Sequence, residues 1–173
     1  MGKGFIVAGA EHSGTRMLTK FFCDCGCAGS PQHKQGFDRG NPRFDHKLVV
    51  WRRSIPHSKE KTPNLSTMYA LFKKIGYDTK IVGITRNKFP NARSQVKMRK
   101  AQTEEQAGKR IDAANNLLQR AKARHKNDYI SVSYTDFVKS RDYRKDLAER
   151  CGLEYSEKQD YSNADEKYYT IEN

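Results

Sequence analysis

Four short apolar runs, spaced along the chain, give the first expectation about its fold. They lie at 4–9 (GFIVAG), 47–52 (KLVVWR), 80–85 (KIVGIT) and 128–134 (DYISVSY). A strand that is buried on both faces has continuous rather than alternating apolar positions, and β-branched residues favour strands. The pattern therefore predicts parallel strands that are covered by helices on both sides.

Between these runs, apolar residues recur at helical spacing. Helices are expected over 13–22, 65–76, 103–126 and about 136–151. The second stretch stops at Gly76, and the third opens on Thr103 and Gln106, a capping-box pair. One face of the third is apolar and is expected to face the core: Ala107, Ile111, Ala114, Leu118 and Ala121.

The order of these elements predicts an α/β fold in three layers, with a central, mostly parallel sheet of four to five strands flanked by helices. A chain of 173 residues is expected to form one domain over 1–173, with the structure of the tail after about 156 left open. The Gly- and Pro-rich stretch from 23 to 46 is expected to be a long loop that shapes a site.

Apolar runs are short throughout the sequence. None approaches the roughly 20 residues that cross a bilayer. The first residues, MGKGFIVAG, are too few for a signal peptide and lack its cleavage pattern. The protein is therefore expected to be cytoplasmic.

The net charge of the chain indicates which kind of binding partner to expect. The chain has 33 Lys and Arg against 20 Asp and Glu, a formal net charge of +13. This excess favours an anionic partner, which could be nucleic acid, a multiply phosphorylated cofactor or an acidic substrate. A protein that is merely basic would have the same composition.

Three of the four cysteines cluster in CDCGC, at Cys23, Cys25 and Cys27; the fourth is Cys151. The C-x-C spacing differs from the C-x-x-C of most zinc knuckles, and no second pair follows at a suitable distance. We expect buried or loop thiols, with a metal site as the less favoured alternative.

The first apolar run leads into GAEHSGTR, whose two glycines have the spacing of a phosphate-binding loop. Thr15 and Arg16 stand where nucleotide triphosphatases have Lys and then Ser or Thr, so an ordinary ATPase or kinase is disfavoured. Backbone N–H groups at the start of the following helix, with the hydroxyls of Ser13 and Thr15, could still hold a phosphate or sulfate. The alternative is that both hydroxyls only cap the helix.

A second motif, ITRNKFPNARS, follows the third apolar run. Arg86 comes directly off a predicted strand, and Ser94 follows in a predicted helix. A guanidinium from a strand end and a hydroxyl from a helix can converge on one phosphate. The alternative for Arg86 is a surface ion pair.

Together the two motifs resemble those of the sulfotransferases that use 3′-phosphoadenosine-5′-phosphosulfate (PAPS), which have a P-loop-type fold. In that family a loop such as P-K-S-G-T-T binds the 5′-phosphosulfate, and R-[DN]-P-x-[DE]-x-x-x-S after a later strand holds the 3′-phosphate. The matching residues are Ser13, Gly14, Thr15, Arg86, Asn87 and Ser94. The resemblance extends over about residues 4–153, through LLQRAKARHKNDYISVSYTDFV and LAERCGL.

The sequence also departs from the family pattern. His12 stands where a Lys or Arg usually precedes S-G-T, and Arg16 replaces the second Thr. The proline of the second motif is Pro90 rather than residue 88, and the family's C-terminal R-K-G-x-x-G-x-W segment is absent. These departures bear on activity more than on fold.

The resemblance implies an enzyme that transfers a sulfuryl group from PAPS to a hydroxyl or amine acceptor by in-line displacement, with no metal. It implies cofactor contacts from Glu11, His12, Ser13, Gly14, Thr15, Arg16, Arg86 and Ser94. His12, if cationic, would act at the leaving phosphate, and His57 is the first candidate for the catalytic base. It lies in WRRSIPHSKE, where relatives have K-T-H-L-P.

Other candidates for the base are His33, Glu11 and the Asp45–His46 pair, and a solvated loop histidine is the alternative for His57. Arg52 and Arg53 are expected either to steer an acidic acceptor or to lie at a solvated strand end.

Two other classes of function remain open. A divergent P-loop nucleotide kinase or hydrolase would need ATP, magnesium and a lysine that the loop lacks. A basic, non-catalytic nucleic-acid-binding protein would concentrate Lys and Arg in a stripe with exposed aromatics, whereas here they are spread along the chain. The acceptor and the oligomeric state are not specified by the sequence.

Overall fold

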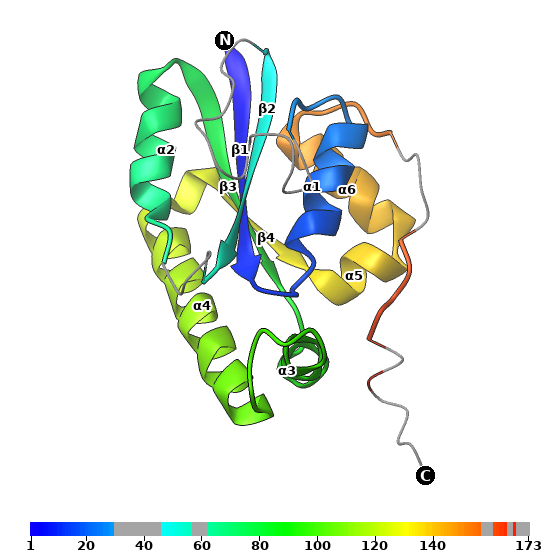
Figure 1. The fold of residues 1–173 in the computed structure, drawn as a ribbon. Coiled ribbons are helices and arrows are strands. Elements are labelled where there is room, and N and C mark those ends of the chain that lie inside the picture. Colours follow the sequence, from blue (N-terminus) through cyan, green and yellow to red (C-terminus); the bar gives the residue numbers. More distant parts are fainter. Residues whose placement is uncertain (30–45, 57–61, 157–160, 166–167, 169–173) are drawn as a thin grey trace.

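Four parallel strands form one sheet in the order β2-β1-β3-β4 (Figure 1). In this computed structural model, the residues described are 1–29, 46–56, 62–156, 161–165 and 168. The strands are β1 (Gly2–Ala10), β2 (Leu48–Ile55), β3 (Tyr77–Thr85) and β4 (Tyr129–Ser133). The helices are α1 (Thr15–Asp24), α2 (Leu65–Lys74), α3 (Lys88–Lys97), α4 (Glu104–Arg124), α5 (Tyr134–Lys139) and α6 (Arg141–Cys151). A 3-10 turn, Lys126–Asp128, precedes β4.

Helices cover both faces of the sheet, α2 and α4 on one side and α1, α5 and α6 on the other (Figure 1). Side chains alternate along β1, so that Phe5 and Val7 join the core beneath α1, α5 and α6. Ile6 and Ala8 join the core beneath α2 and α4. Because both faces of the sheet are covered, β1, β2 and β3 each contain a continuous or nearly continuous run of buried residues, as the sequence predicted.

The predicted α/β fold is confirmed, with a four-stranded, all-parallel sheet between two helical layers. All five residues of the predicted apolar stripe on α4 are buried. The Thr103 hydroxyl accepts from the Gln106 amide, as expected of a cap, and Gly76 follows α2 in the left-handed conformation with φ of +95°.

The prediction of a single helix over about 136–151 is wrong. Two helices, α5 and α6, occupy this stretch. Ser140 lies between them in an extended conformation, and its hydroxyl accepts from the Tyr143 amide. This N-cap starts a new helix, because it satisfies a backbone N–H that the first turn leaves without a partner.

Strand β1 is the point where the order of the sheet reverses. The chain passes from β1 to β2 on one side, and then returns to β3 on the other side of β1. In open parallel sheets, ligands bind outside the carboxyl ends of the strands at such a point. The loop after β1 and the residues after β3 meet at this edge, where α3 also lies (Figure 1).

The cysteines are inside the protein. Cys25, Cys27 and Cys151 are buried and Cys23 is half-buried, all as free thiols. Burial raises the pKa of Cys23 to about 11 and that of Cys151 to about 12, so these thiols are protonated at neutral pH. They behave as small apolar side chains in the core beneath α1.

Within the ranges given above, no helix combines the length and the apolar character needed to cross a bilayer.

Candidate functional site

The loop from Glu11 to Gly14 connects β1 to α1 in a conformation that depends on two glycines. Gly14 has φ of +97°, and a Cβ there would come within 2.7 Å of the Tyr134 ring. A Cβ on Gly9 would lie 2.7 Å from the Ile84 carbonyl oxygen of β3. Both positions therefore need glycine for close packing, and Gly14 also needs it for its backbone angle.

The N-terminus of α1 has unused donors. Its N-cap, Gly14, has no side-chain cap, and the first turn has no acidic residue. The Ser13 hydroxyl is buried and has no hydrogen-bond partner among the described residues, while the Thr15 hydroxyl lies 3.4 Å from that of Ser54. The expectation that Ser13 and Thr15 only cap the helix is therefore wrong. Free N–H groups and a positive dipole end are the features that bind anions.

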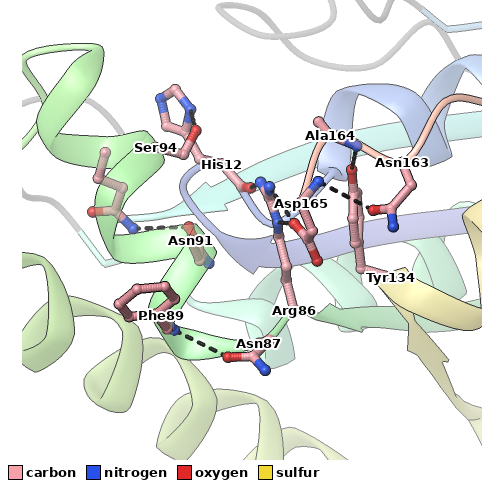
Figure 2. A network of polar contacts seen from close by, with 11 residues as sticks. His12, Arg86, Asn87, Phe89, Asn91, Ser94, Tyr134, Asn163, Ala164 and Asp165 are labelled. Carbon is pink, nitrogen blue, oxygen red and sulfur yellow. Dashed lines mark hydrogen bonds and ion pairs between the residues drawn. The ribbon is translucent and has the colours of Figure 1, made fainter. Parts of the chain in front are cut away.

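The two motifs meet in space. The Arg86 Nη1 donates to the His12 carbonyl oxygen at 2.7 Å, and the His12 Nδ1 lies 3.1 Å from the Ser94 hydroxyl (Figure 2). From α3, the Gln95 Nε2 donates to the Glu11 carbonyl oxygen at 3.0 Å. The structure therefore joins the loop after β1 to both the Arg and the Ser of the second motif. Gln95 is a contact that the motifs did not predict.

Cations surround this loop. The pKa of His12 is lowered, first by burial and then by Lys100, Arg86 and Arg16. Burial raises the pKa of Glu11, against the opposing effect of Lys100 and Arg110. His12 is therefore mainly neutral at pH 7 in the ligand-free protein, and the expectation of a cationic His12 requires a bound anion or acid conditions.

Arg86 has a second partner that the sequence did not reveal. Its side chain is 5% exposed, and its Nε donates to the Asp165 carboxylate at 2.6 Å (Figure 2). The guanidinium also lies over the Tyr134 ring, 4.5 Å from the centroid. The alternative considered for Arg86, a surface ion pair, is thus wrong, because the pair is buried. No local sequence pattern identifies Asp165 as a partner of Arg86, because it lies 79 residues after Arg86 in the chain.

The other predicted residues have separate positions. Arg16 is exposed on the first turn of α1. His57, His33 and Asp45 lie outside the described residues. The His46 carbonyl accepts from the hydroxyl of Tyr77, the first residue of β3. His46 therefore lies at the amino ends of the strands, whereas the loop lies at their carboxyl ends.

Arg52 and Arg53 do not lie at a solvated strand end. Both are within β2, where Arg52 is 6% exposed and the Arg53 guanidinium lies 4.0 Å from the centroid of the Trp51 ring.

A cavity of about 750 Å³ lies elsewhere, between the start of α2 and the end of α4. None of the site residues above lines it; its wall includes Leu65, Leu117, Ala121 and Arg124. In the part of the chain that the structure describes, no three His, Cys, Asp or Glu side chains are grouped to hold a metal ion.

The fold is that of an α/β protein with an all-parallel sheet, in which a glycine-containing loop connects the first strand to the first helix. Its structure is similar to that of the sulfotransferase domain from the Synechococcus PCC 7002 olefin synthase, with a TM-score of 0.59 at 11% sequence identity. The similarity covers 99% of this chain and 78% of that domain's chain. No family model and no curated protein sequence matches the chain. The protein therefore has a sulfotransferase-like fold.

Proposed function

We propose that this protein is a PAPS-dependent sulfotransferase, which transfers a sulfuryl group from PAPS to a hydroxyl or amine acceptor. The observation that carries the proposal is the contact between the two motifs. The loop after β1 is bonded to Arg86 through the His12 carbonyl and lies beside Ser94 through the His12 ring. One nucleotide with phosphates at both ends could therefore contact both motifs.

The donors of the site fit such an anion. The start of α1 has backbone N–H groups without a side-chain cap, and the buried Ser13 hydroxyl has no partner among the described residues. Lys100, Arg86 and Arg16 all act on His12, so the positive potential is concentrated at the same loop. Fixed donors and cations of this kind favour a multiply charged anion over a neutral ligand.

In this proposal the loop holds the 5′-phosphosulfate and the second motif holds the 3′-phosphate. The loop contacts come from Glu11, His12, Ser13, Gly14, Thr15 and Arg16. The second motif contributes the Arg86 guanidinium and the Ser94 hydroxyl. PAPS supplies the activated sulfuryl group, and 3′,5′-bisphosphoadenosine is the product that leaves.

The chain's own residues stabilise charge and position the reactants. As the bond from sulfur to the phosphate oxygen breaks, negative charge grows on that oxygen, next to the amides of the α1 N-terminus and the His12 ring. An anion there raises the pKa of His12, so the ring can take a proton and add positive charge. No step requires a metal ion.

The acceptor must lose a proton as its bond to sulfur forms. We propose His57 as the base, because a histidine pKa suits proton abstraction near neutral pH. Glu11 is the alternative that the structure brings to the loop, and its raised pKa would make it a better base than an exposed carboxylate.

The test compares ligands that separate the three classes of function. Adenosine 3′,5′-bisphosphate, ATP with Mg²⁺ and a DNA oligomer are added to the protein, and binding is measured by thermal shift and calorimetry. A ligand at 100 times its Kd stabilises the protein by about 2.7 kcal/mol. We expect this for the bisphosphate. Stabilisation by ATP–Mg²⁺ alone, or by DNA alone, would contradict the proposal.

The role of the second motif has its own variant. Arg86→Lys keeps the charge but removes the planar fork that binds two oxygens of one phosphate. We expect it to weaken bisphosphate binding by about tenfold or more, while binding of adenosine 5′-monophosphate changes little. Arg150→Lys, on the surface of α6, is the matched control. Equal losses for both nucleotides would refute the 3′-phosphate role.

A further inference from the structure

The chain returns to the candidate site after α6. Asp165 is 4% exposed, and both its carboxylate and the Arg86 side chain are almost completely buried against each other. The carboxylate accepts from the Arg86 Nε at 2.6 Å and also pairs with Nη2 (Figure 2). Both contacts are to Oδ1, so Nε and Nη2, on one side of the guanidinium, face the same carboxylate oxygen, and of the two only Nε donates a hydrogen bond to it.

This return is anchored on both sides of Asp165. Tyr161 packs in the core, with its ring 5.1 Å from that of Phe137. The Ala164 amide donates to the Tyr134 hydroxyl at 3.1 Å. Beyond Asp165, the Tyr168 carbonyl accepts from the Arg93 Nη1 at 3.0 Å. The carboxylate is therefore held on Arg86 by the contacts of Tyr161, Ala164 and Tyr168, and not by a chance approach.

Asp165 pairs with Arg86, which is only one of the two parts of the site; the other part is the N-terminus of α1. It neutralises Arg86, but the first turn of α1 has no acidic residue and the Ser13 hydroxyl has no partner among the described residues. A carboxylate has two acceptor oxygens and one charge, whereas a phosphomonoester has three acceptor oxygens and nearly two charges. The two groups bind the same guanidinium fork, and Arg86 cannot give the same nitrogens to both.

We infer that Asp165 is an internal competitor for the phosphate site. In the ligand-free protein it occupies Arg86 in place of a phosphomonoester, and the segment around it must leave when the phosphate binds. This inference rests on the proposed function, because it takes Arg86 as the ligand of the 3′-phosphate. The segment is thus an autoinhibitory contact that the nucleotide displaces.

The effect of this competition on the apparent Kd of a ligand can be calculated. The apparent Kd of a ligand is its intrinsic Kd divided by the fraction of molecules whose site is open. A segment that occupies Arg86 in nine molecules out of ten or more weakens binding by about tenfold or more. Removing the negative charge of Asp165 should abolish this loss, so that the ligand binds about tenfold more tightly.

The first experiment measures binding to the full-length protein by calorimetry. Asp165→Asn is compared with wild type and with Asp142→Asn, which removes the same charge from a side chain that is 92% exposed on α6. We expect Asp165→Asn to bind adenosine 3′,5′-bisphosphate about tenfold more tightly, and Asp142→Asn to bind as wild type does. Equal affinity in Asp165→Asn and wild type would overturn the inference.

The second experiment needs no substitution. Hydrogen exchange of the wild-type protein is followed by NMR at the Ala164 amide, which is bonded to Tyr134, and at the Tyr168 amide, which is bonded to the Asp165 carbonyl. We expect both amides to lose protection when the bisphosphate saturates the protein. If Asp165 has only a structural role, both amides stay protected at saturation, which would overturn the inference.

A third comparison separates this inference from the proposed function. Inorganic phosphate replaces the nucleotide in the calorimetry. If no variant binds the bisphosphate, the proposed function fails; tighter phosphate binding by Asp165→Asn than by wild type then still upholds the competition at Arg86. If the bisphosphate binds, equal bisphosphate affinity in Asp165→Asn and wild type overturns the inference while the proposed function stands. If the bisphosphate does not bind, equal phosphate affinity in the two proteins overturns it.

Discussion

His12 is the residue at which the loop, β3 and α3 come together. Its carbonyl accepts from Arg86, its ring lies beside the Ser94 hydroxyl, and its backbone has φ of 61°. A left-handed conformation is uncommon for a residue other than glycine, and such residues are frequent at functional sites. His12 is therefore held through its backbone carbonyl by Arg86 and through its ring by Ser94.

The pKa of His12 gives a test of the electrostatics around the loop. Lys100 is the first of the three cations that lower it, after burial. Replacing Lys100 by Gln should raise this pKa towards its ordinary value, because one repulsive charge is lost. NMR titration of the imidazole carbon-bound protons measures it. Lys97→Gln, an exposed lysine at the end of α3, is the control.

The same pKa determines how stability depends on pH. The folded protein binds a proton at His12 less readily than the unfolded chain does, so this residue contributes stability above about pH 6.5. That contribution falls as the pH drops through the lowered value. An unchanged His12 pKa in Lys100→Gln would mean that Lys100 does not contribute to the shift, and that burial, Arg86 and Arg16 cause it.

Sequence reasoning found the loop side chains because strand, glycine spacing and hydroxyls are all local. It also brought Arg86 and Ser94 to the same place through a resemblance. It missed Asp165, because the pairing with Arg86 depends on how a tail without hydrophobic periodicity folds back. It left the charge of His12 open, because that charge depends on burial and on cations from three separate parts of the chain.

At the scale of elements, the passage from β1 to α1 is the part that builds the site. The helix begins directly after its N-cap Gly14, whose lack of a Cβ atom leaves room for the Tyr134 ring at the start of α5. The loop therefore packs against the start of α5, although Tyr134 lies 120 residues after Gly14 in the chain. A side chain at position 14 would push the loop and α5 apart.

Gly14→Ala should destabilise the protein for two reasons, backbone strain and overlap with Tyr134. Gly76→Ala is the matched control, since Gly76 has nearly the same φ, +95°, with nothing within 4 Å of its Cβ position. We expect the control to cost about 1 kcal/mol, and Gly14→Ala to cost about 1–3 kcal/mol more.

Urea unfolding measures both variants, with the slope of the transition checked for constancy. Equal costs in the two variants would show that the Tyr134 contact contributes nothing and that only the left-handed backbone matters.

The elements themselves were largely predictable. Four strands and the helices between them follow from continuous apolar runs and helical spacing, since these patterns are imposed by burial on both faces of the sheet. The break between α5 and α6 was missed because apolar residues lie on both sides of it, and the stretch between them (139–146, KSRDYRKD) contains no glycine or proline that would indicate a helix end. Only the hydroxyl of Ser140 marks the new start.

At the scale of the whole molecule, the formal net charge of +13 remains after the ion pairs are formed. The surface pairs, such as those of Lys88 with Asp112 and Lys109 with Glu105, are exposed and contribute little to stability. The folded protein therefore experiences net self-repulsion, which the compact state must withstand.

Stability should accordingly rise with salt. Raising the sodium chloride concentration from about 10 to 100 mM shortens the Debye length from about 30 to 10 Å. If screening stabilises the folded state by about 1 kcal/mol, Tm rises by about 2–4 °C for a chain of this length. Calorimetric melting in the two buffers measures it. A Tm that falls over this range would contradict the idea that repulsion opposes folding.

The site joins parts of the chain that are far apart in sequence. Arg86 bonds to the loop 74 residues before it and to an acidic side chain 79 residues after it. A ribosome makes the chain from its amino end, so the loop emerges first and has no complete site until the third strand follows. The carboxylate that neutralises Arg86 is synthesised last. Until Asp165 has been synthesised, the growing chain therefore lacks the carboxylate that pairs with the Arg86 guanidinium in the complete protein.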